Sequence, residues 1–183
     1  RAEEAPIIAS KIGFPVVLKV VSTELAHKSD AGGVMVNLQN KKAVSDAIEK
    51  MPADFDHFLV EEMAGPVVAE IIIGVSRDEA FGLSLLIGTG GILVELLDDT
   101  VSLLLPVQKP EIEEAMRSLK VFNLIDSHRG RERGDFDATI DAIMAVAQFA
   151  VDNNATLAEL DVNPLIIQPK GVIAVDALIR QYE

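Results

Sequence analysis

The sequence predicts a fold of the α+β (α/β) class, organised as two α+β lobes. The chain has 183 residues, of which 49% are hydrophobic and 25% are charged, so it can bury a core. Apolar, strand-like runs alternate with helical patterns, but without the regular βαβ periodicity of a doubly wound sheet. We therefore expect one lobe in residues 1–59 and a second in residues 60–183, with a hinge near residues 60–63.

The first lobe is expected to begin with a helix that is followed by two strands. Residues 3–11 have helical character, and Gly13 with Pro15 provides a C-terminal glycine and a stop. Residues 16–21 form a dense apolar, β-branched run typical of a buried strand. A second β-rich run covers residues 34–38.

The first lobe should close with a helix and a short strand. In residues 41–51 the apolar side chains Val44, Ile48 and Met51 recur at helical spacing. Residues 58–62 are a short strand-like run that leads into the expected hinge.

The second lobe is predicted to contain a strand-rich middle, two helices and closing strands. A Gly-Pro turn at residues 65–66 precedes the first long strand. The expected strands are 67–76, 83–87, 93–97, 100–107, 157–162, 165–168 and 172–175, and the expected helices are 110–119 and 136–150.

Composition excludes several classes of function. A net charge of −13 argues against nucleic-acid binding and against an anionic membrane surface. The absence of cysteine excludes disulfides and thiolate metal sites, and it fits a cytoplasmic protein. The apolar stretch 81–97 is interrupted by glycines and contains Glu95, which makes it a poor membrane span. No secretory signal is visible at the N-terminus. Because the chain starts at Arg1 and not at Met, and its first residues resemble the tail of a helix, we expect a piece of a larger polypeptide.

A phosphate site is indicated between the first two strands. Lys19 lies inside a buried run, where a charge is costly unless it meets an anion, although its amine could also reach solvent. Gly32 and Gly33 would let backbone N–H groups approach an anion closely. His27 lies beside them, and a lone histidine is otherwise more often structural than catalytic.

The segment 13–34 resembles the phosphate-handling part of the ATP-grasp domain in NDP-forming acyl-CoA synthetases, the ADP-forming acetate–CoA ligases. More distantly, it is similar to the succinyl-CoA synthetase β subunit. Further blocks of the same family follow in family order, and the similarity runs from about residue 3 to residue 180. These blocks are residues 74–82, 87–95 and 159–165 with 174–177. The resemblance implies an ATP-grasp fold, here without its first N-terminal elements.

The resemblance implies roles for the residues of the first phosphate-binding segment. The lysine matching Lys19 contacts the nucleotide phosphates as a point charge. The histidine matching His27 accepts phosphate and becomes a phosphohistidine, a task that suits a neutral, nucleophilic imidazole. Lys28, Gly32 and Gly33 would then bind the phosphates.

Two further groups of residues are expected to bind nucleotide. Glu61, Glu62 and Met63 occupy the hinge, where the family's backbone meets adenine and an acid meets the ribose; a pair of solvated acids is an equally plausible interpretation. Glu70 and Arg77 could pair with each other or hold the γ-phosphate.

A metal pair is expected near the C-terminal end of the chain. Asp161 and Asn163 share a strand face, and a hairpin could bring Asp176 opposite Asn163. A turn and a strand-end cap would also explain Asn163 and Asp176. The resemblance selects these two as Mg²⁺ ligands, and Asp161 and Glu159 fit the motif without an assigned role.

Two loops complete the set of candidates. Gly88, Gly90 and Gly91, followed by Glu95, look like the loop that a phosphorylated segment approaches, although a simple β-turn would need the same glycines. The basic cluster at residues 129–133 is better explained as a solvated loop.

The resemblance predicts an enzyme in which acid, CoA and ATP give acyl-CoA, ADP and phosphate through an acyl phosphate. The expected cofactors are ATP/ADP and Mg²⁺, and this chain would supply the phosphoryl step. A CoA-binding or ligase domain or subunit would bring the carboxylic acid and CoA, and we expect an oligomer. Two alternatives remain: a regulatory nucleotide-binding module of an acetyltransferase-like protein, and a fragment that binds ATP poorly.

Overall fold

A computed structural model describes residues 1–21, 32–52, 54–91, 99–126, 130 and 132–182. The chain divides into two compact units, Arg1–Ala64 and Gly65–Glu183. The boundary expected from the sequence, after residue 59, falls inside the strand β3 (Phe58–Glu62). That strand pairs along its length with a strand of the first unit, which is why the division lies beyond it.

In the part of the first unit that the structure describes, a three-stranded antiparallel sheet packs with two helices. Strand order is β2-β1-β3, so β1 lies in the centre. Gly13, at φ 104°, ends the first helix in a conformation that favours glycine, and the Asn40 side chain caps the second by accepting the Ala43 N–H at 2.9 Å. In chain order the elements are α1 (Ala5–Ile12), β1 (Val16–Val20), β2 (Val34–Leu38), α2 (Lys41–Lys50) and β3.

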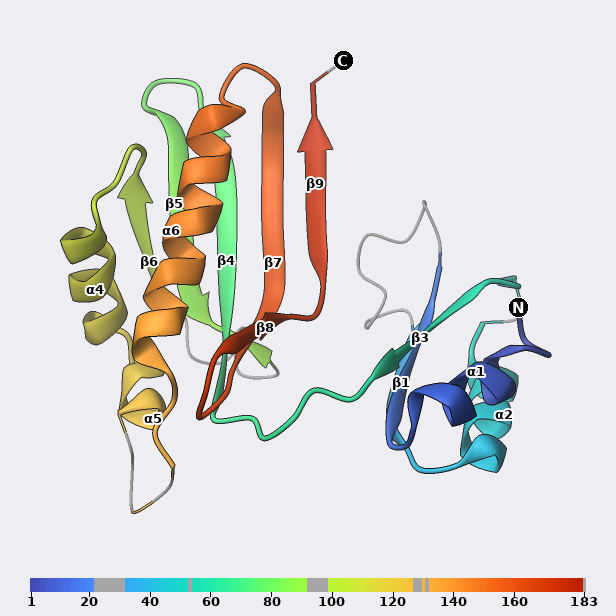
Figure 1. Ribbon diagram of the computed structural model, residues 1–183. Coiled ribbons are helices and arrows are strands. Elements are labelled where there is room, and N and C mark those ends of the chain that lie inside the picture. Colours follow the sequence, from blue (N-terminus) through green and yellow to red (C-terminus); the bar gives the residue numbers. More distant parts are fainter. Residues whose placement is uncertain (22–31, 53, 92–98, 127–129, 131, 183) are drawn as a thin grey trace. The chain divides into compact units, whose positions relative to one another are not determined.

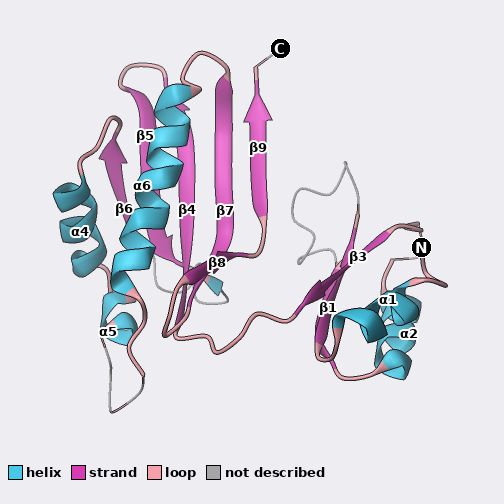
Figure 2. Cartoon of the chain, in the orientation of Figure 1, coloured by secondary structure: helices cyan, strands magenta, loops and turns pink. Residues whose placement is uncertain are grey.

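Helices α1 and α2 cover one face of this sheet (Figure 2). Val16, Leu18 and Val20 on β1 point into the core that these helices close. Because side chains alternate along a strand, Val17 and Lys19 belong to the opposite face. The structure thus confirms the predicted buried strand with one lysine in it, and this lysine belongs to the face opposite the core.

The described residues of the second unit form a six-stranded antiparallel sheet and three helices. Its strand order is β6-β5-β4-β7-β8, and β9 also pairs with β7. The strands are β4 (Ala69–Asp78), β5 (Gly82–Thr89), β6 (Thr100–Leu104), β7 (Leu157–Ile167), β8 (Val172–Ala174) and β9 (Ala177–Gln181). The helices are α4 (Lys109–Ser118), α5 (Phe122–Ile125) and α6 (Phe136–Asp152).

The three helices lie on one face of the larger sheet (Figure 1). Burial alternates along β4, with Ile71, Ile73 and Val75 packed in the core under the helices. Glu70 and Gly74 consequently belong to the face that α4 and α6 do not cover. This open face is where β4 and β7 can present polar side chains.

The secondary structure differs from the sequence prediction in three places. Strand β7 continues through Pro164 as one strand, because an irregularity in its pairing with β4, between Ile71 and Ile73, accommodates the proline. Short α5 and edge strand β9 were not predicted, since neither has a clear periodic pattern. The expected strand 93–97 lies outside the described residues.

No helix in the described part of the chain combines the length and hydropathy needed to cross a membrane.

Candidate functional site

Lys19 is the candidate phosphate-binding residue of the first unit. Its side chain is only 12% exposed, and its ammonium Nζ lies 2.6 Å from Glu61 Oε2. In the register of β1 and β3, Lys19 faces Leu59 and Val17 faces Glu61, so the two charged residues are diagonal neighbours. Long side chains bridge such diagonals readily. The anion that meets the lysine within the protein is thus a carboxylate of the neighbouring strand.

The glycine pair, Gly32 and Gly33, lies just before β2. Gly32 has φ 68°, and no atom of the described residues lies within 4 Å of the position that a Cβ would take. The Gly33 carbonyl accepts the Val20 N–H at 2.8 Å, which fixes the pair next to the lysine-bearing strand. His27 and Lys28 lie outside the described residues.

The three residues expected at the hinge, Glu61, Glu62 and Met63, make different contacts. The side chain of Glu61 contacts Lys19, whereas Glu62 is exposed at the end of β3. The Met63 N–H donates to the Pro15 carbonyl at 3.3 Å. A contact between this N–H and an adenine ring would have to replace that hydrogen bond.

Asn163 and Asp176 lie opposite each other in the second unit. The Asn163 N–H donates to the Asp176 carbonyl at 3.2 Å, and the Val175 N–H donates to the Pro164 carbonyl at 3.2 Å. These bonds continue the β7–β8 ladder past the end of β8. The structure therefore brings together the two residues that were expected to form the metal pair.

The donor set of this pair suits Mg²⁺. An amide oxygen and a carboxylate are hard oxygen ligands, and Mg²⁺ usually takes one or two protein ligands besides water and phosphate. Among the described residues, no group of three or more His, Cys, Asp or Glu side chains is arranged to hold a metal ion. The protein would therefore supply a partial shell, which phosphate and water oxygens complete.

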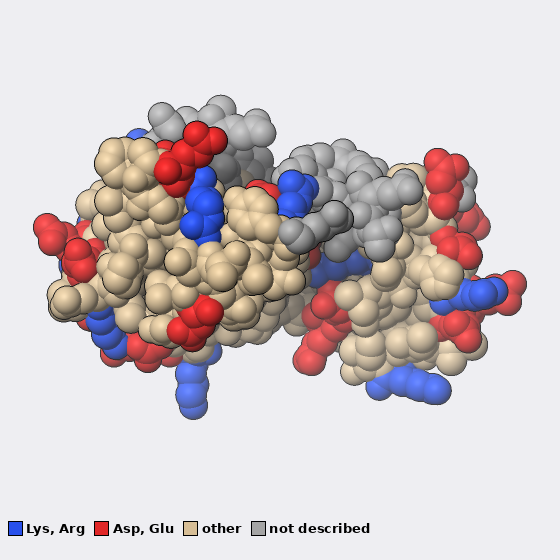
Figure 3. Space-filling model, turned by 90° about the horizontal axis from the view of Figure 1, so that it is seen from above, with Lys and Arg blue, Asp and Glu red and all other residues tan. Residues whose placement is uncertain are grey.

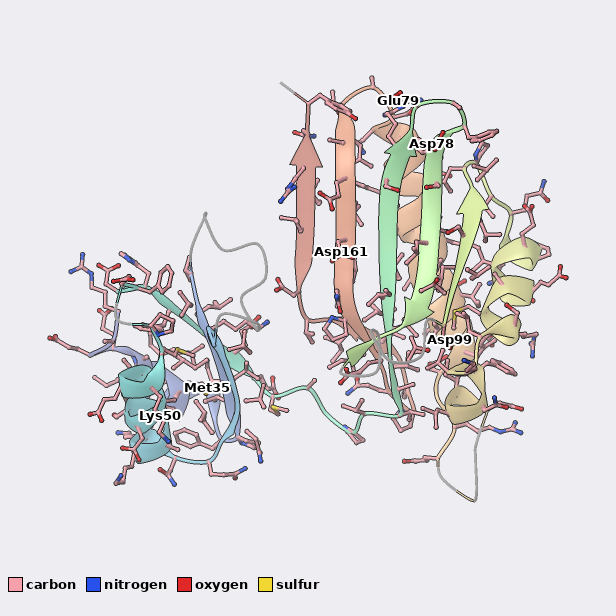
Figure 4. All side chains as sticks on the ribbon, turned by 180° about the vertical axis from the view of Figure 1, so that it is seen from behind. Met35, Lys50, Asp78, Glu79, Asp99 and Asp161 are labelled. Carbon is pink, nitrogen blue, oxygen red and sulfur yellow. The ribbon has the colours of Figure 1, made fainter. Side chains whose placement is uncertain are left out.

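Two acids belong to the open face of the same sheet. Asp161 on β7 lies opposite Gly74 on β4. Its Oδ1 is 4.0 Å from the position that a Cβ on Gly74 would take. Figure 4 shows Asp161 on β7, viewed from the side opposite the helices. Glu70 occupies the same face of β4. Both acids therefore belong to the sheet face that the helices leave open.

Glu70 is in close contact with the glycine-rich segment after β5. The Gly90 N–H donates to the Glu70 carbonyl at 2.8 Å. A side chain on Gly90 would meet the backbone of Glu70 and Ile71 at 2.9 Å, and one on Gly91, at φ 72°, would collide with the Glu70 carboxylate. These glycines are required by close approach and not only by a turn.

Arg77 does not join the acid with which it was expected to pair. It stands seven positions beyond Glu70 on β4, which in an extended strand is roughly 23 Å. Its guanidinium donates to the Asn154 carbonyl and, at 2.9 Å, to the Asn154 side-chain oxygen. Pairing with each other, one of the two roles considered for Glu70 and Arg77, is therefore wrong, because the strand separates them and the turn after α6 binds the arginine. Their other role, holding the γ-phosphate, stays a prediction.

The sequence did not point to Asp99, a buried acid that lies just before β6. It accepts hydrogen bonds from the Thr89 hydroxyl at 2.5 Å and from the N–H groups of Lys120 and Val121 at 3.0 and 3.2 Å. Burial raises the pKa of Asp99, but these hydrogen bonds outweigh it and bring the pKa below its usual value. No sequence motif marks such a residue.

Asp135 connects α6 to the β7–β8 hairpin, which carries Asn163 and Asp176. Its carboxylate accepts the Gly171 N–H at 2.8 Å and the Ala138 N–H at 3.0 Å. These two hydrogen bonds lower the pKa of Asp135. An aspartate just before a helix is a typical N-cap, so this half of its role was readable from the sequence.

Charged side chains of both signs are spread over the described surface that Figure 3 shows. On the face seen in Figure 3, basic side chains are separated from one another by acidic and uncharged ones. This agrees with the net charge of −13.

A two-lobed α+β fold with a little-exposed lysine beside a glycine pair on one sheet, and an amide and a carboxylate brought together on another, is typical of nucleotide-binding proteins. A family model described as an ATP-grasp domain matches residues 1–180. The β subunit of the ADP-forming acetate–CoA ligase I of Pyrococcus furiosus is 34% identical, with 96% of this chain and 78% of the relative covered. The corresponding Archaeoglobus fulgidus ligase is 35% identical, but the chain covers only 27% of it.

Solved structures agree with this comparison. An acetyl-coenzyme A synthetase of Ca. Korarchaeum cryptofilum, in complex with coenzyme A and Ca-AMPCP, has a TM-score of 0.88 and 38% identity; the match covers all of this chain and 82% of that one. A second structure of that enzyme, with Mg-AMPPCP, has a TM-score of 0.82 and 39% identity, with 100% and 83% covered. The chain belongs to the ATP-grasp domain family, and it is the ATP-grasp portion of an ADP-forming acyl-CoA synthetase.

Proposed function

We propose that this chain binds ATP with Mg²⁺ and carries out the phosphoryl step of an ADP-forming acid–CoA ligase. The observation that carries the proposal is Lys19, an ammonium held on a central strand with little exposure and next to the glycine pair. Such a charge suits a nucleotide phosphate. The curated relatives described above are ligases, which favours this role over that of a regulatory module.

The residues of the chain divide the work between the two units. Lys19 attracts the phosphates, and Gly32 and Gly33 allow backbone to approach them. Asn163 and Asp176 would hold Mg²⁺, which supplies charge neutralisation at the β- and γ-phosphate oxygens. Glu70 and Asp161 lie on the same sheet face and would orient water around that ion.

His27 is the proposed phosphate carrier. A neutral ring nitrogen attacks the γ-phosphorus, an N–P bond forms, and the P–O bond to ADP breaks, so that ADP leaves with the electron pair. The reverse step returns the phosphoryl group to ADP. One solved relative is described with its phosphohistidine segment pointing towards the nucleotide-binding site, which supports a carrier in this family.

The remaining steps need a partner portion. A CoA-binding or ligase domain or subunit would bind the carboxylic acid and CoA and form the acyl phosphate. The Pyrococcus furiosus relative is described as a β subunit, which supports an assembly of more than one chain. We propose that the complete enzyme is an oligomer of this kind.

The metal assignment is tested by calorimetric titration of the protein with ATP, with and without Mg²⁺. Asn163→Ala and Asp176→Ala should each abolish most of the gain that Mg²⁺ gives and leave metal-free ATP binding almost unchanged. Asp141→Ala is the control, because Asp141 lies on α6 and pairs with Lys109. Equal ATP affinity with and without Mg²⁺ in all proteins would refute the metal pair.

A further inference from the structure

Glu61 is turned toward the phosphate-binding lysine. Sequence comparison expected an acid at this hinge to meet the ribose, but Oε2 of Glu61 lies 2.6 Å from Lys19 Nζ. That oxygen is shielded from solvent, whereas the Glu61 side chain as a whole is 38% exposed. The Glu61 carboxylate on β3 thus lies against the Lys19 ammonium on the neighbouring strand β1.

The burial of Lys19 explains why such a partner is needed. A nearly buried ammonium without an anion is strongly unfavourable, and removal of one member of a buried ion pair leaves that cost uncompensated. The exposed pair Lys42–Asp46 has the same 2.6 Å separation, but its side chains are 82% and 45% exposed. Water can replace the partner there, and such surface pairs contribute little.

We propose that Glu61 is the resident counter-ion of Lys19 and that it competes with the nucleotide phosphates for the ammonium. The proposal rests on the proposed function, in which Lys19 binds those phosphates. Glu61 stabilises the charged lysine before nucleotide binds. When a phosphate reaches the same ammonium, the two anions repel each other, so Glu61 weakens phosphate binding and favours nucleotide release.

The effect must therefore depend on the charge of the ligand. Adenosine carries no phosphate and has no interaction with the Lys19–Glu61 pair. ADP and ATP carry increasing negative charge, and the repulsion from a nearby carboxylate increases with it. A direct contact between Glu61 and the ribose would instead affect all three ligands to a similar extent.

The test is a calorimetric titration of the full-length protein and its Glu61→Gln variant with adenosine, ADP and ATP. The glutamine keeps the size of the side chain and removes its charge. We expect ATP to bind roughly three- to tenfold more tightly to the variant, ADP to gain less, and adenosine to bind equally well. Asp46→Asn removes one charge from an equally short but exposed pair, and it should change none of the three affinities.

A double-mutant cycle assigns the effect to the pair. In a Lys19→Met background, Glu61→Gln should give a smaller gain in ATP affinity, because the carboxylate no longer neutralises an ammonium and only its direct repulsion of the phosphates remains. Should Glu61→Gln prove too unstable to purify, Glu61→Asp withdraws the carboxylate by one methylene. That variant is expected to show a smaller gain in the same ligand order.

The outcomes separate this proposal from the proposed function. A loss of adenosine affinity in Glu61→Gln would assign Glu61 to the ribose. Unchanged or weaker ATP binding in that variant would show that the carboxylate does not oppose phosphate. Either result overturns the counter-ion role of Glu61 and leaves the proposed function standing. A wild-type protein that binds none of the three ligands overturns the proposed function and this proposal with it.

Discussion

Lys19 combines a charge, low exposure and a place on the central strand of the first unit. Its neighbours Val17 and Val20 are buried, so the strand is held by apolar packing and not by the lysine. The fold therefore tolerates a change of charge at this position, provided that the volume is kept. We therefore expect the charge of Lys19 to matter more for phosphate binding than for the stability of the strand.

The first prediction concerns Lys19→Met. Methionine retains the stem and removes the ammonium, and folding should survive although Glu61 loses its partner. ATP affinity should fall by roughly one to two decades, because a charge-assisted hydrogen bond contributes about 1.5–3 kcal/mol. Calorimetry with ATP measures the loss, and circular dichroism checks the fold. Lys42→Met is the matched control, and unchanged ATP binding in Lys19→Met would remove the lysine from the phosphate site.

At the scale of elements, Asp135 joins α6 to the turn between β7 and β8. One carboxylate oxygen accepts the Ala138 N–H of the helix and the other accepts the Gly171 N–H of the turn. The hairpin that this turn closes carries Asn163 and Asp176. The helix cap and the position of the metal pair thus share one side chain.

Asp135→Ala should destabilise the protein by about 1–2 kcal/mol at neutral pH, because it removes an N-cap and a second backbone acceptor. The pKa of Asp135 is lowered in the folded protein, so its contribution is present above the unfolded pKa of about 3.9 and is lost as pH falls through the lower folded value. Urea denaturation should show the difference from wild type shrinking below about pH 4.

Asp135→Ser distinguishes the two contacts. A serine can still cap α6, but it is too short to reach Gly171 as well, so it should recover part of the lost stability. Asp137→Ala, in the first turn of the same helix, controls for the loss of one charge. A difference between wild type and Asp135→Ala that stays constant from pH 3 to pH 7 would contradict the assignment.

At the scale of the whole molecule, the binding groups are divided between two units. Lys19, Glu61 and the glycine pair belong to Arg1–Ala64, while Glu70, Asn163 and Asp176 belong to Gly65–Glu183. Each unit by itself therefore holds only some of the candidate residues. We expect neither unit alone to support the proposed phosphoryl step.

The last prediction is that His27 carries phosphate in the full-length enzyme. Incubation with γ-labelled ATP should place an acid-labile, base-stable label on the peptide that contains His27. His27→Ala should abolish that label and retain most of the ATP affinity, because the imidazole acts after binding.

His57→Ala is the control for this experiment. His57 is exposed, and its Nδ1 lies 2.5 Å from the Asp56 carboxylate, so its loss should leave the label intact. The label must be mapped by peptide, since the ligase portion of such enzymes can carry a second phosphohistidine. An active enzyme that never carries phosphate on the His27 peptide would disprove the carrier role.

The sequence by itself determined the features that depend on near neighbours in the chain. Apolar runs and caps predicted most of the helices and strands, and the short separation of Asn163 and Asp176 predicted their meeting in a hairpin. The ATP-grasp family was also readable, because its blocks keep their order and their residues. These signals survive without tertiary information since they are set by local spacing.

Only the tertiary structure decided which charged groups meet. Lys19 finds Glu61 through the register of β1 and β3, and Arg77 finds Asn154, 77 positions away, at the turn after α6. Asp99 becomes a buried acceptor through a helix junction some 20 residues later. Register and helix packing bring such residues together across long stretches of chain, and local periodicity carries no information about partners at that distance.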